Sequence, residues 1–119
     1  MDWKKIESRN NPGVKYAVSL CDKKARDREG VFCAEGVTLF LDFAKIGLYP
    51  EKIYLSEGSL SLKDSVEDAL GENQTECLLL SPHVFEKVTT EKGSQGILSV
   101  YSKAALSRVL PLEKHRWRA

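Results

Sequence analysis

Three short segments of this 119-residue sequence carry the side chains best suited to bind a polyanion. The first is a basic run over residues 23–28, where four lysines or arginines accompany a single aspartate. Such side chains neutralise phosphate groups, and the resulting binding weakens with salt and ignores nucleotide sequence. For Arg26, a salt bridge to a neighbouring acid is an equally open interpretation. The residues expected to contact phosphates are Lys15, Lys23, Lys24, Arg26 and Arg28.

The second segment, Glu35-Gly36, stands where a predicted strand meets a predicted helix, and Thr38 follows it. The first N–H groups of a helix are free and form a positive dipole end, which suits a phosphate or the edge of a base. Glu35 could accept a hydrogen bond from a base amino group or a ribose 2′-hydroxyl. The same carboxylate could instead cap the helix N-terminus, and the two roles can coexist.

The third segment, residues 89–96, is a polar loop that leads directly into a predicted strand. Loops at one end of an α/β sheet can converge on one surface, so this loop and the Glu35-Gly36 junction are expected to line a common site. Gln95 can both donate and accept hydrogen bonds. Gly36 and Gly96 permit close approach of a ligand, although a backbone conformation with positive φ explains them equally well. The specific contacts are therefore assigned to Glu35, Gly36, Thr38, Thr90, Gln95 and Gly96.

Charge is distributed unevenly, although the formal net charge is only +1. Residues 1–28 carry +4, residues 29–100 carry −7 and residues 101–119 carry +4. Two basic ends around an acidic middle hint at contact with nucleic acid. Random clustering on a solvated surface explains the charges alone at least as well.

The sequence lacks the signatures GxGxxG, GxxxxGK[ST], HExxH and GxSxG, which mark common nucleotide-binding and hydrolytic enzymes. His83 and His115 have no cysteine or serine nearby at a spacing that suggests a dyad, and a plain surface or packing role is expected for His83. The isolated chain is therefore not expected to be an enzyme. No cofactor site and no metal site is predicted in it.

The three cysteines, Cys21, Cys33 and Cys77, lie far apart and form no CxxC pair. An odd number of cysteines without an export signal predicts reduced thiols and a cytoplasmic location. Cys33 and Cys77 fall in predicted strands, where they are expected to be small core residues. No run of 18 apolar residues is present, so no membrane contact is predicted.

Apolar spacing and turn residues predict alternating helices and strands. A helix is expected to start at Asn11-Pro12 and to bury Val14, Ala17, Val18 and Cys21. Residues 22–29 are expected to form a second short helix or an extension of the first. The later elements are strands over 31–35, 52–56, 76–80 and 97–101, helices over 37–46, 62–70 and 82–88, and a possible helical turn or two after residue 102.

This alternation predicts a three-layer α/β/α sandwich around a sheet of about four strands, mostly parallel or mixed. Leu39, Phe43 and Ile46 are expected to widen the apolar face of the helix over 37–46. Ser61 is expected to cap the helix over 62–70. The domain is expected to cover residues 1–102, with residues 103–119 as a tail or linker.

Taken together, these segments resemble the N-terminal substrate-binding domain of the SpoU (TrmH) family of RNA 2′-O-ribose methyltransferases. The similarity covers roughly residues 4–101, and the matching pieces occur in the family's order and at its spacing. The matching pieces are residues 8–15 (SRNNPGVK), 23–26 (KKAR), 32–36 (FCAEG), 47–54 (GLYPEKIY) and 94–98 (SQGIL).

The resemblance implies a ribosomal-protein-like α/β/α fold that presents structured RNA, rRNA or tRNA, to a methyltransferase. In the family, S-adenosylmethionine binding, catalysis and dimerisation belong to a separate C-terminal knotted domain. That domain is missing here, so the chain is expected to be either a fragment or a shortened gene product. The alternative is a protein-interaction or regulatory α/β domain without RNA affinity, which the acidic middle of the chain favours.

Overall fold

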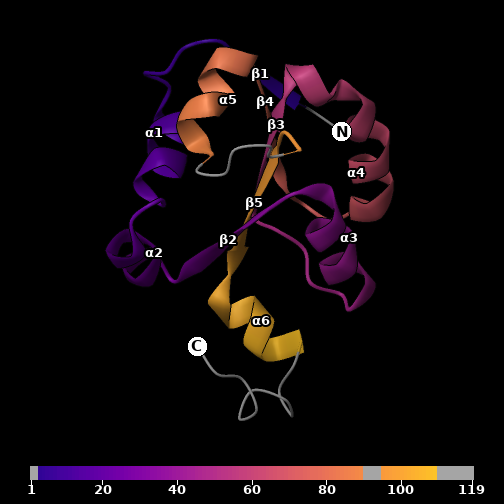
Figure 1. Cartoon of the computed structure of the whole chain (residues 1–119). Coiled ribbons are helices and arrows are strands. Elements are labelled where there is room, and N and C mark those ends of the chain that lie inside the picture. The colour runs from indigo at the N-terminus through magenta and orange to yellow at the C-terminus, as the bar shows by residue number, and fades with distance from the viewer. Residues whose placement is uncertain (1–2, 90–94, 110–119) are drawn as a thin grey trace.

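The described residues form one five-stranded sheet, which is the centre of the fold (Figure 1). The computed structural model describes residues 3–89 and 95–109. The strands are β1 (Trp3–Ile6), β2 (Val31–Glu35), β3 (Lys52–Ser56), β4 (Glu76–Leu80) and β5 (Ile97–Ser102). The order of the strands across the sheet is β1-β4-β3-β5-β2, so neighbouring strands are often distant in sequence.

The sheet is mixed, because β5 runs against the other four strands. β1 and β3 pair in parallel with β4, whereas β5 pairs antiparallel with both β3 and β2. This topology places the start of β5 beside the carboxyl ends of β2 and β3. The loop before β5 and the loop after β2 therefore meet at one edge of the sheet.

Sequence patterns predicted about four strands and missed β1. Lys4 and Lys5 are both exposed in this four-residue strand, so the alternation of apolar and polar residues is absent. β1 lies at the edge of the sheet, where exposed lysines discourage pairing with another chain. Its ends hold it in place, because Ile6 is buried and the indole Nε1 of Trp3 donates a hydrogen bond to Glu67 at 2.7 Å.

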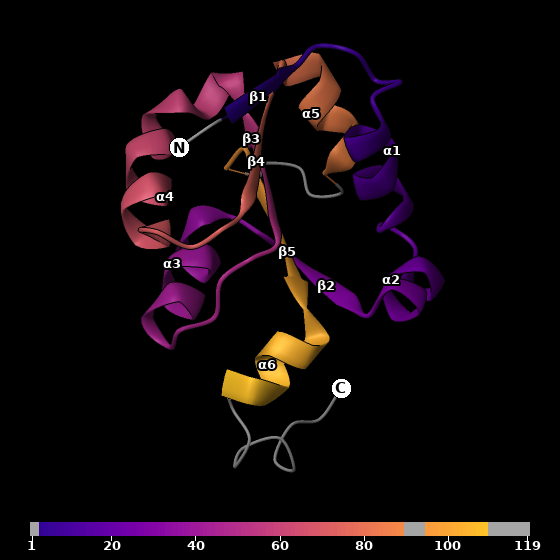
Figure 2. The same ribbon diagram turned by 180° about the vertical axis from the view of Figure 1, so that it is seen from behind.

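Helices cover both faces of the sheet (Figure 2), which confirms the predicted three-layer sandwich. On one face lie α1 (Pro12–Ser19), α2 (Lys23–Glu29) and α5 (Pro82–Val88), and on the other lie α3 (Val37–Lys45) and α4 (Lys63–Leu70). The 3-10 helix η1 (Glu57–Leu62) runs directly into α4. The last described helix, α6 (Lys103–Val109), lies beyond the lower end of the sheet.

Each helical layer packs on its own set of strand side chains. Tyr54 joins the core under α1, α2 and α5, whereas its neighbour Ile53 joins the core under α3 and α4. Successive strand residues point to opposite faces, which divides the apolar residues of β3 between the two cores. Cys77 is fully buried in the second core, as predicted, and burial raises the pKa of its thiol to about 11.

The N-terminus of α1 forms as predicted, but part of its expected apolar stripe is exposed. The side chain of Asn11 accepts hydrogen bonds from two N–H groups of the first turn. Val14 and Ala17 are buried, whereas Val18 is 41% exposed. Cys21 is also exposed, because α1 ends before it and the chain turns into the separate helix α2. The prediction of buried Val18 and Cys21 was therefore wrong.

α3 packs in two directions, but less broadly than predicted. Phe40 is fully buried against the sheet, and Phe43 meets the ring of Tyr101 at a centroid distance of 5.0 Å. Leu39 and Ile46 are 41% and 46% exposed, so their expected contribution to the apolar face was wrong. Neither side chain belongs to the apolar clusters that α3 shares with α4 and α6.

Two predicted details at helix ends need correction or extension. Ser61 does not cap α4, because η1 continues into that helix and the N-cap position falls on Leu62. The helical turns expected after residue 102 are present as α6. Ala105, Leu106 and Val109 of α6 pack on the cluster around Tyr101.

None of the helices in the described ranges is long and apolar enough to cross a membrane.

Candidate nucleic-acid interface

The Glu35-Gly36 junction and the Gln95-Gly96 pair lie side by side at one edge of the sheet. The Gly36 amide donates to the carbonyl of Ile97 at 3.0 Å, and the Ser56 amide donates to the carbonyl of Gly96 at 2.8 Å. Both glycines adopt positive φ, 99° at Gly36 and 83° at Gly96. We call Glu35, Gly36, Gln95 and Gly96 the edge site. The two segments, far apart in sequence, thus form a common surface.

Gln95 caps the N-terminus of α3 from another part of the chain. Its Oε1 accepts a hydrogen bond from the Val37 amide at 2.6 Å. The N-cap residue itself, Gly36, has no side chain to do this. The Ser59 hydroxyl donates to the carbonyl of Gln95 at 2.8 Å and fixes the loop that carries it. One of the helix N–H groups expected to meet a ligand is therefore already engaged by Gln95.

Glu35 is not the N-cap residue of α3, one of the two roles that its sequence position left open, because that position falls on Gly36. It is the last residue of β2, and its carboxylate accepts a hydrogen bond from the Thr89 hydroxyl just after α5. Thr38 is exposed in the first turn of α3. Thr90, also predicted to take part, lies outside the described residues.

Arg26 is the member of the basic run that shares a cleft with Glu35 of the edge site. It lines a cleft of about 400 Å³ together with Cys33, Glu35 and Leu39. Its Nη1 donates to the carbonyl of Leu20 at 2.8 Å, so the guanidinium is held by the end of α1 rather than by the salt bridge considered for it. Cys33 is half-buried rather than fully in the core, and desolvation by burial raises the pKa of its thiol.

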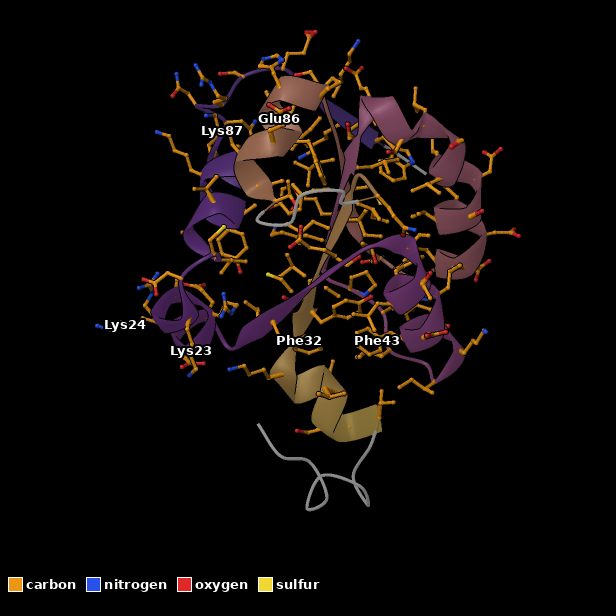
Figure 3. All side chains as sticks on the ribbon, viewed as in Figure 1. Lys23, Lys24, Phe32, Phe43, Glu86 and Lys87 are labelled. Atoms are coloured by element: carbon orange, nitrogen blue, oxygen red, sulfur yellow. The ribbon has the colours of Figure 1, made fainter. Side chains whose placement is uncertain are left out.

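The other cations of the basic run lie farther from the edge site. Lys23 and Lys24 project from α2 at the lower end of the helical layer (Figure 3). Lys23 forms an ion pair with Asp27 at 2.8 Å, and Arg28 forms one with the adjacent Glu29 at 3.4 Å. The sequence run is thus divided, with Arg26 at the cleft and Lys23 and Arg28 partly neutralised by acids of the same helix.

A second cleft, of about 750 Å³, lies beside α1 and α5. Lys15 lines it, and so do three residues that sequence reasoning did not select, namely Arg9, His83 and Lys87. The spacing of His83 and Lys87, four residues apart on a predicted helix, was the available signal, because residues i and i+4 share a helix face. Arg9 offered no such signal, since only the fold of the chain brings it to α5.

Asp27 links α2 to α6. Its carboxylate accepts hydrogen bonds from the Nζ atoms of Lys23 and Lys103, each at 2.8 Å. The Lys103 amide also donates to the carbonyl of Gly30 at 2.9 Å. The hydrogen bonds from Lys103 and then Lys23 lower the pKa of Asp27 to about 2 from its ordinary 3.8.

We expect Asp27→Asn to lower the melting temperature slightly near neutral pH. A depressed folded-state pKa stabilises the protein above the ordinary pKa, and this stabilisation disappears as the pH falls through the folded-state value. The difference in melting temperature between variant and wild type should therefore disappear between about pH 4 and pH 2, as thermal unfolding followed by circular dichroism would show. Asp68→Asn, at an exposed position of α4, is the matched control. An equal gap at every pH would contradict the expectation.

Within the described ranges, no group of three or more His, Cys, Asp or Glu residues is placed to hold a metal ion. The two clefts are lined by cations, by the carboxylates of Glu7 and Glu35 and by the Asn10 amide. These groups suit hydrogen bonding and charge neutralisation.

A family profile described as the MRM3-like substrate binding domain matches residues 11–99 of the chain. No curated protein matches the sequence. Among solved structures, an rRNA methyltransferase from Sinorhizobium meliloti superposes with a TM-score of 0.72 at 22% sequence identity. An RNA 2′-O ribose methyltransferase superposes with a TM-score of 0.65 at 23% sequence identity. A putative RNA methyltransferase of the TrmH family from Porphyromonas gingivalis superposes with a TM-score of 0.57 at 17% sequence identity.

These three matches cover 86%, 83% and 81% of this chain but only 38%, 37% and 36% of the solved chains. The chain therefore spans less than half the length of each, and at such identities the likeness shows a shared fold. The family match covers most of the chain independently of these structures. The resemblance to SpoU-type RNA methyltransferases is thus confirmed, and the chain belongs to the MRM3-like substrate binding domain family.

Proposed function

We propose that this chain recognises structured RNA for an S-adenosylmethionine-dependent 2′-O-ribose methyltransferase that modifies rRNA or tRNA. Its own task is to bind and orient RNA, and methyl transfer belongs to a C-terminal domain of the parent protein. The observation that carries the proposal is the edge site, where two segments predicted to bind RNA meet beside Arg26. Membership of a substrate-binding family supports the same conclusion.

Arg26 and the edge-site residues contribute different kinds of contact. Arg26, held by the Leu20 carbonyl, presents its guanidinium to phosphate with little loss of conformational freedom. Glu35 accepts from a base amino group or a ribose 2′-hydroxyl. Gln95 uses Oε1 to cap α3, so its amide nitrogen is the donor assigned to RNA. Gly36 and Gly96 both have positive φ, and their missing side chains leave room for Gln95 and Ser59, so they shape the site rather than contact RNA themselves.

S-adenosylmethionine would bind elsewhere in the parent protein. One matching structure of the Sinorhizobium enzyme contains it, under the name AdoMet. The Arg26 cleft and the cleft beside α1 and α5 place arginine or lysine side chains in their walls, which disfavours the sulfonium cation of this ligand. When bound, S-adenosylmethionine supplies the methyl group. A parent homodimer formed through its catalytic domain and a cytoplasmic location are parts of the same proposal.

RNA binding by the chain is the direct test. Fluorescence anisotropy with labelled rRNA fragments and tRNA should show affinity that falls steeply with salt, because phosphate contacts release counterions. Gln95→Ala should lower the affinity for the preferred RNA roughly fivefold, which corresponds to the loss of about one hydrogen bond. The same substitution removes the α3 cap and should cost about 1 kcal/mol of stability.

Gln74→Ala is the matched control, because Gln74 is exposed in the loop after α4 and away from the edge site. It should leave both RNA affinity and stability unchanged. Binding that ignores salt, or no binding to any RNA, would contradict the proposal. In the second case the alternative of a protein-interaction domain would take its place.

A further inference from the structure

The cleft beside α1 and α5 carries more uncompensated positive charge than the basic run that the sequence makes conspicuous. We call it the α1–α5 groove and define it by Arg9, Lys15, His83 and Lys87. We propose that this groove binds the phosphodiester backbone of RNA, with Arg9, Lys15 and Lys87 each facing phosphate oxygens. This inference rests on the proposed function and adds a second contact region to the edge site.

Two stretches of chain that are separate in sequence build the groove, residues 7–18 and α5. Arg9 comes from the connection between β1 and α1, Lys15 from the first helical turns of α1, and His83 and Lys87 from successive turns of α5. α1 is held against the sheet by buried Val14 and Ala17, and α5 by buried Val84 and Phe85. Packing of the two helices therefore fixes the backbone positions that carry Lys15, His83 and Lys87 before a ligand arrives.

The cations of the groove and those of α2 differ in how many form ion pairs. Among the described residues, all three of Arg9, Lys15 and Lys87 form no ion pair, whereas two of the four cations of α2, Lys23 and Arg28, are paired. A cation already matched by a carboxylate gains less from a phosphate, because part of its field is cancelled. Uncompensated charge therefore favours the groove over α2 as the main phosphate contact.

The remaining lining also suits a phosphodiester backbone. Ser8 and Asn10 contribute hydroxyl and amide groups, and Glu7 is the carboxylate among the lining residues. Glu86 is adjacent to Lys87 on α5 but does not line the groove (Figure 3). Contacts to phosphate and sugar typically come from such cationic and small polar groups. Exposed Val18 adds limited apolar surface, which argues against a large hydrophobic partner.

The groove and the edge-site cleft lie along the same pair of helices. On α1, Val18 lines the groove and the adjacent Ala17 lines the cleft that contains Arg26. On α5, Lys87 lines the groove and the adjacent Val88 lines that same cleft. One RNA molecule can therefore follow α1 and α5 from Arg9 toward Arg26. In this arrangement the groove supplies affinity and orientation, and the edge site reads the nucleotides.

The test is a double charge reversal, Lys15→Glu with Lys87→Glu, in the full 119-residue chain. Both side chains are exposed and, within the described part of the chain, hydrogen-bond to no other residue, so the fold should persist. With a fluorescein-labelled RNA hairpin, affinity at about 0.1 M salt should fall roughly 30-fold, and the slope of log K against log salt should become shallower by about 1.5. The loss should be similar for hairpins of different sequence.

The matched control reverses Lys45 and Lys63, on α3 and α4 of the opposite face, and makes the same change in net charge. It should keep most of the affinity and the salt slope. Circular dichroism and melting temperature check the fold of each variant, and Lys15→Gln with Lys87→Gln repeats the test if charge reversal disturbs it.

Wild-type affinity and slope in the Lys15/Lys87 variants would overturn the groove proposal, and an equal loss in the Lys45/Lys63 control would do the same. In either case a loss in Gln95→Ala would leave the proposed function standing. Failure of the wild-type chain to bind any RNA would remove both. A final arm titrates poly-glutamate, and preferential binding of that polymer over RNA would assign the groove to an acidic protein instead.

Discussion

Replacing Phe40 with alanine should lower the free energy of unfolding by about 3 to 5 kcal/mol. Phe40 is fully buried, with 0% of its surface accessible to solvent. It projects from α3 into the core that also contains Ile53 and Val66. Its removal leaves a cavity as well as a loss of buried apolar surface. Urea unfolding followed by tryptophan fluorescence or circular dichroism measures the change.

Leu39→Ala is the matched control on the same helix. Leu39 adjoins Phe40 in sequence but is 41% exposed, so its truncation should cost less than about 1 kcal/mol. Phe40→Ala should also weaken RNA binding, because α3 carries the backbone amides at the edge site. Equal costs for the two variants would show that α3 is not anchored on the sheet by Phe40.

Gly96→Ala should cost about 3 kcal/mol and disrupt the edge site. A Cβ at this position would lie 2.1 Å from Oγ and 2.8 Å from Cβ of Ser59, and the backbone has φ of 83°. Strain at positive φ contributes about 1 kcal/mol and forced repacking adds about 1 to 3 kcal/mol. Rotation of Ser59 alone does not relieve the contact, because its Cβ is too close and its hydroxyl would lose the Gln95 carbonyl.

Two comparisons separate strain from collision. Gly30→Ala has a similar φ of 68° and no atom within 4 Å of the added Cβ, so it should cost only about 1 kcal/mol. Adding Ser59→Gly to Gly96→Ala should recover part of the lost stability in a double-mutant cycle. Equal unfolding free energies for Gly96→Ala and Gly30→Ala would argue that the edge site tolerates a side chain at residue 96.

The edge site could be located from the sequence only in part. Glu35-Gly36 and Gln95-Gly96 stood out by residue type and by their positions before a helix and before a strand. The sequence did not show that Gln95 caps α3 or that Glu35 accepts from Thr89, because both contacts join segments more than 50 residues apart. Such contacts depend on the antiparallel placement of β5 between β3 and β2.

Local patterns predicted most elements of the fold, since helix caps, apolar spacing and turn glycines act over a few residues. The limits of β2, β3, β4 and α5 agree with the sequence analysis, whereas β1 was missed. The lysines of β1 are exposed to solvent because β1 is an edge strand, and which strand lies at the edge is a property of the assembled sheet. The exposure of Val18 and Leu39 was missed for the same reason, because burial depends on which neighbour covers each helix.

By itself, the sequence determined the α/β class, the candidate residues of the edge site and the family, because these depend on residue type, short-range spacing and motif order. The tertiary structure alone decided which cations act together. Arg26 shares a cleft with Glu35, Lys23 is paired with Asp27, and Lys15 and Lys87 from two helices line one groove. The physical reason is that electrostatic interactions follow distances in space, and the sheet order sets those distances between segments remote in sequence.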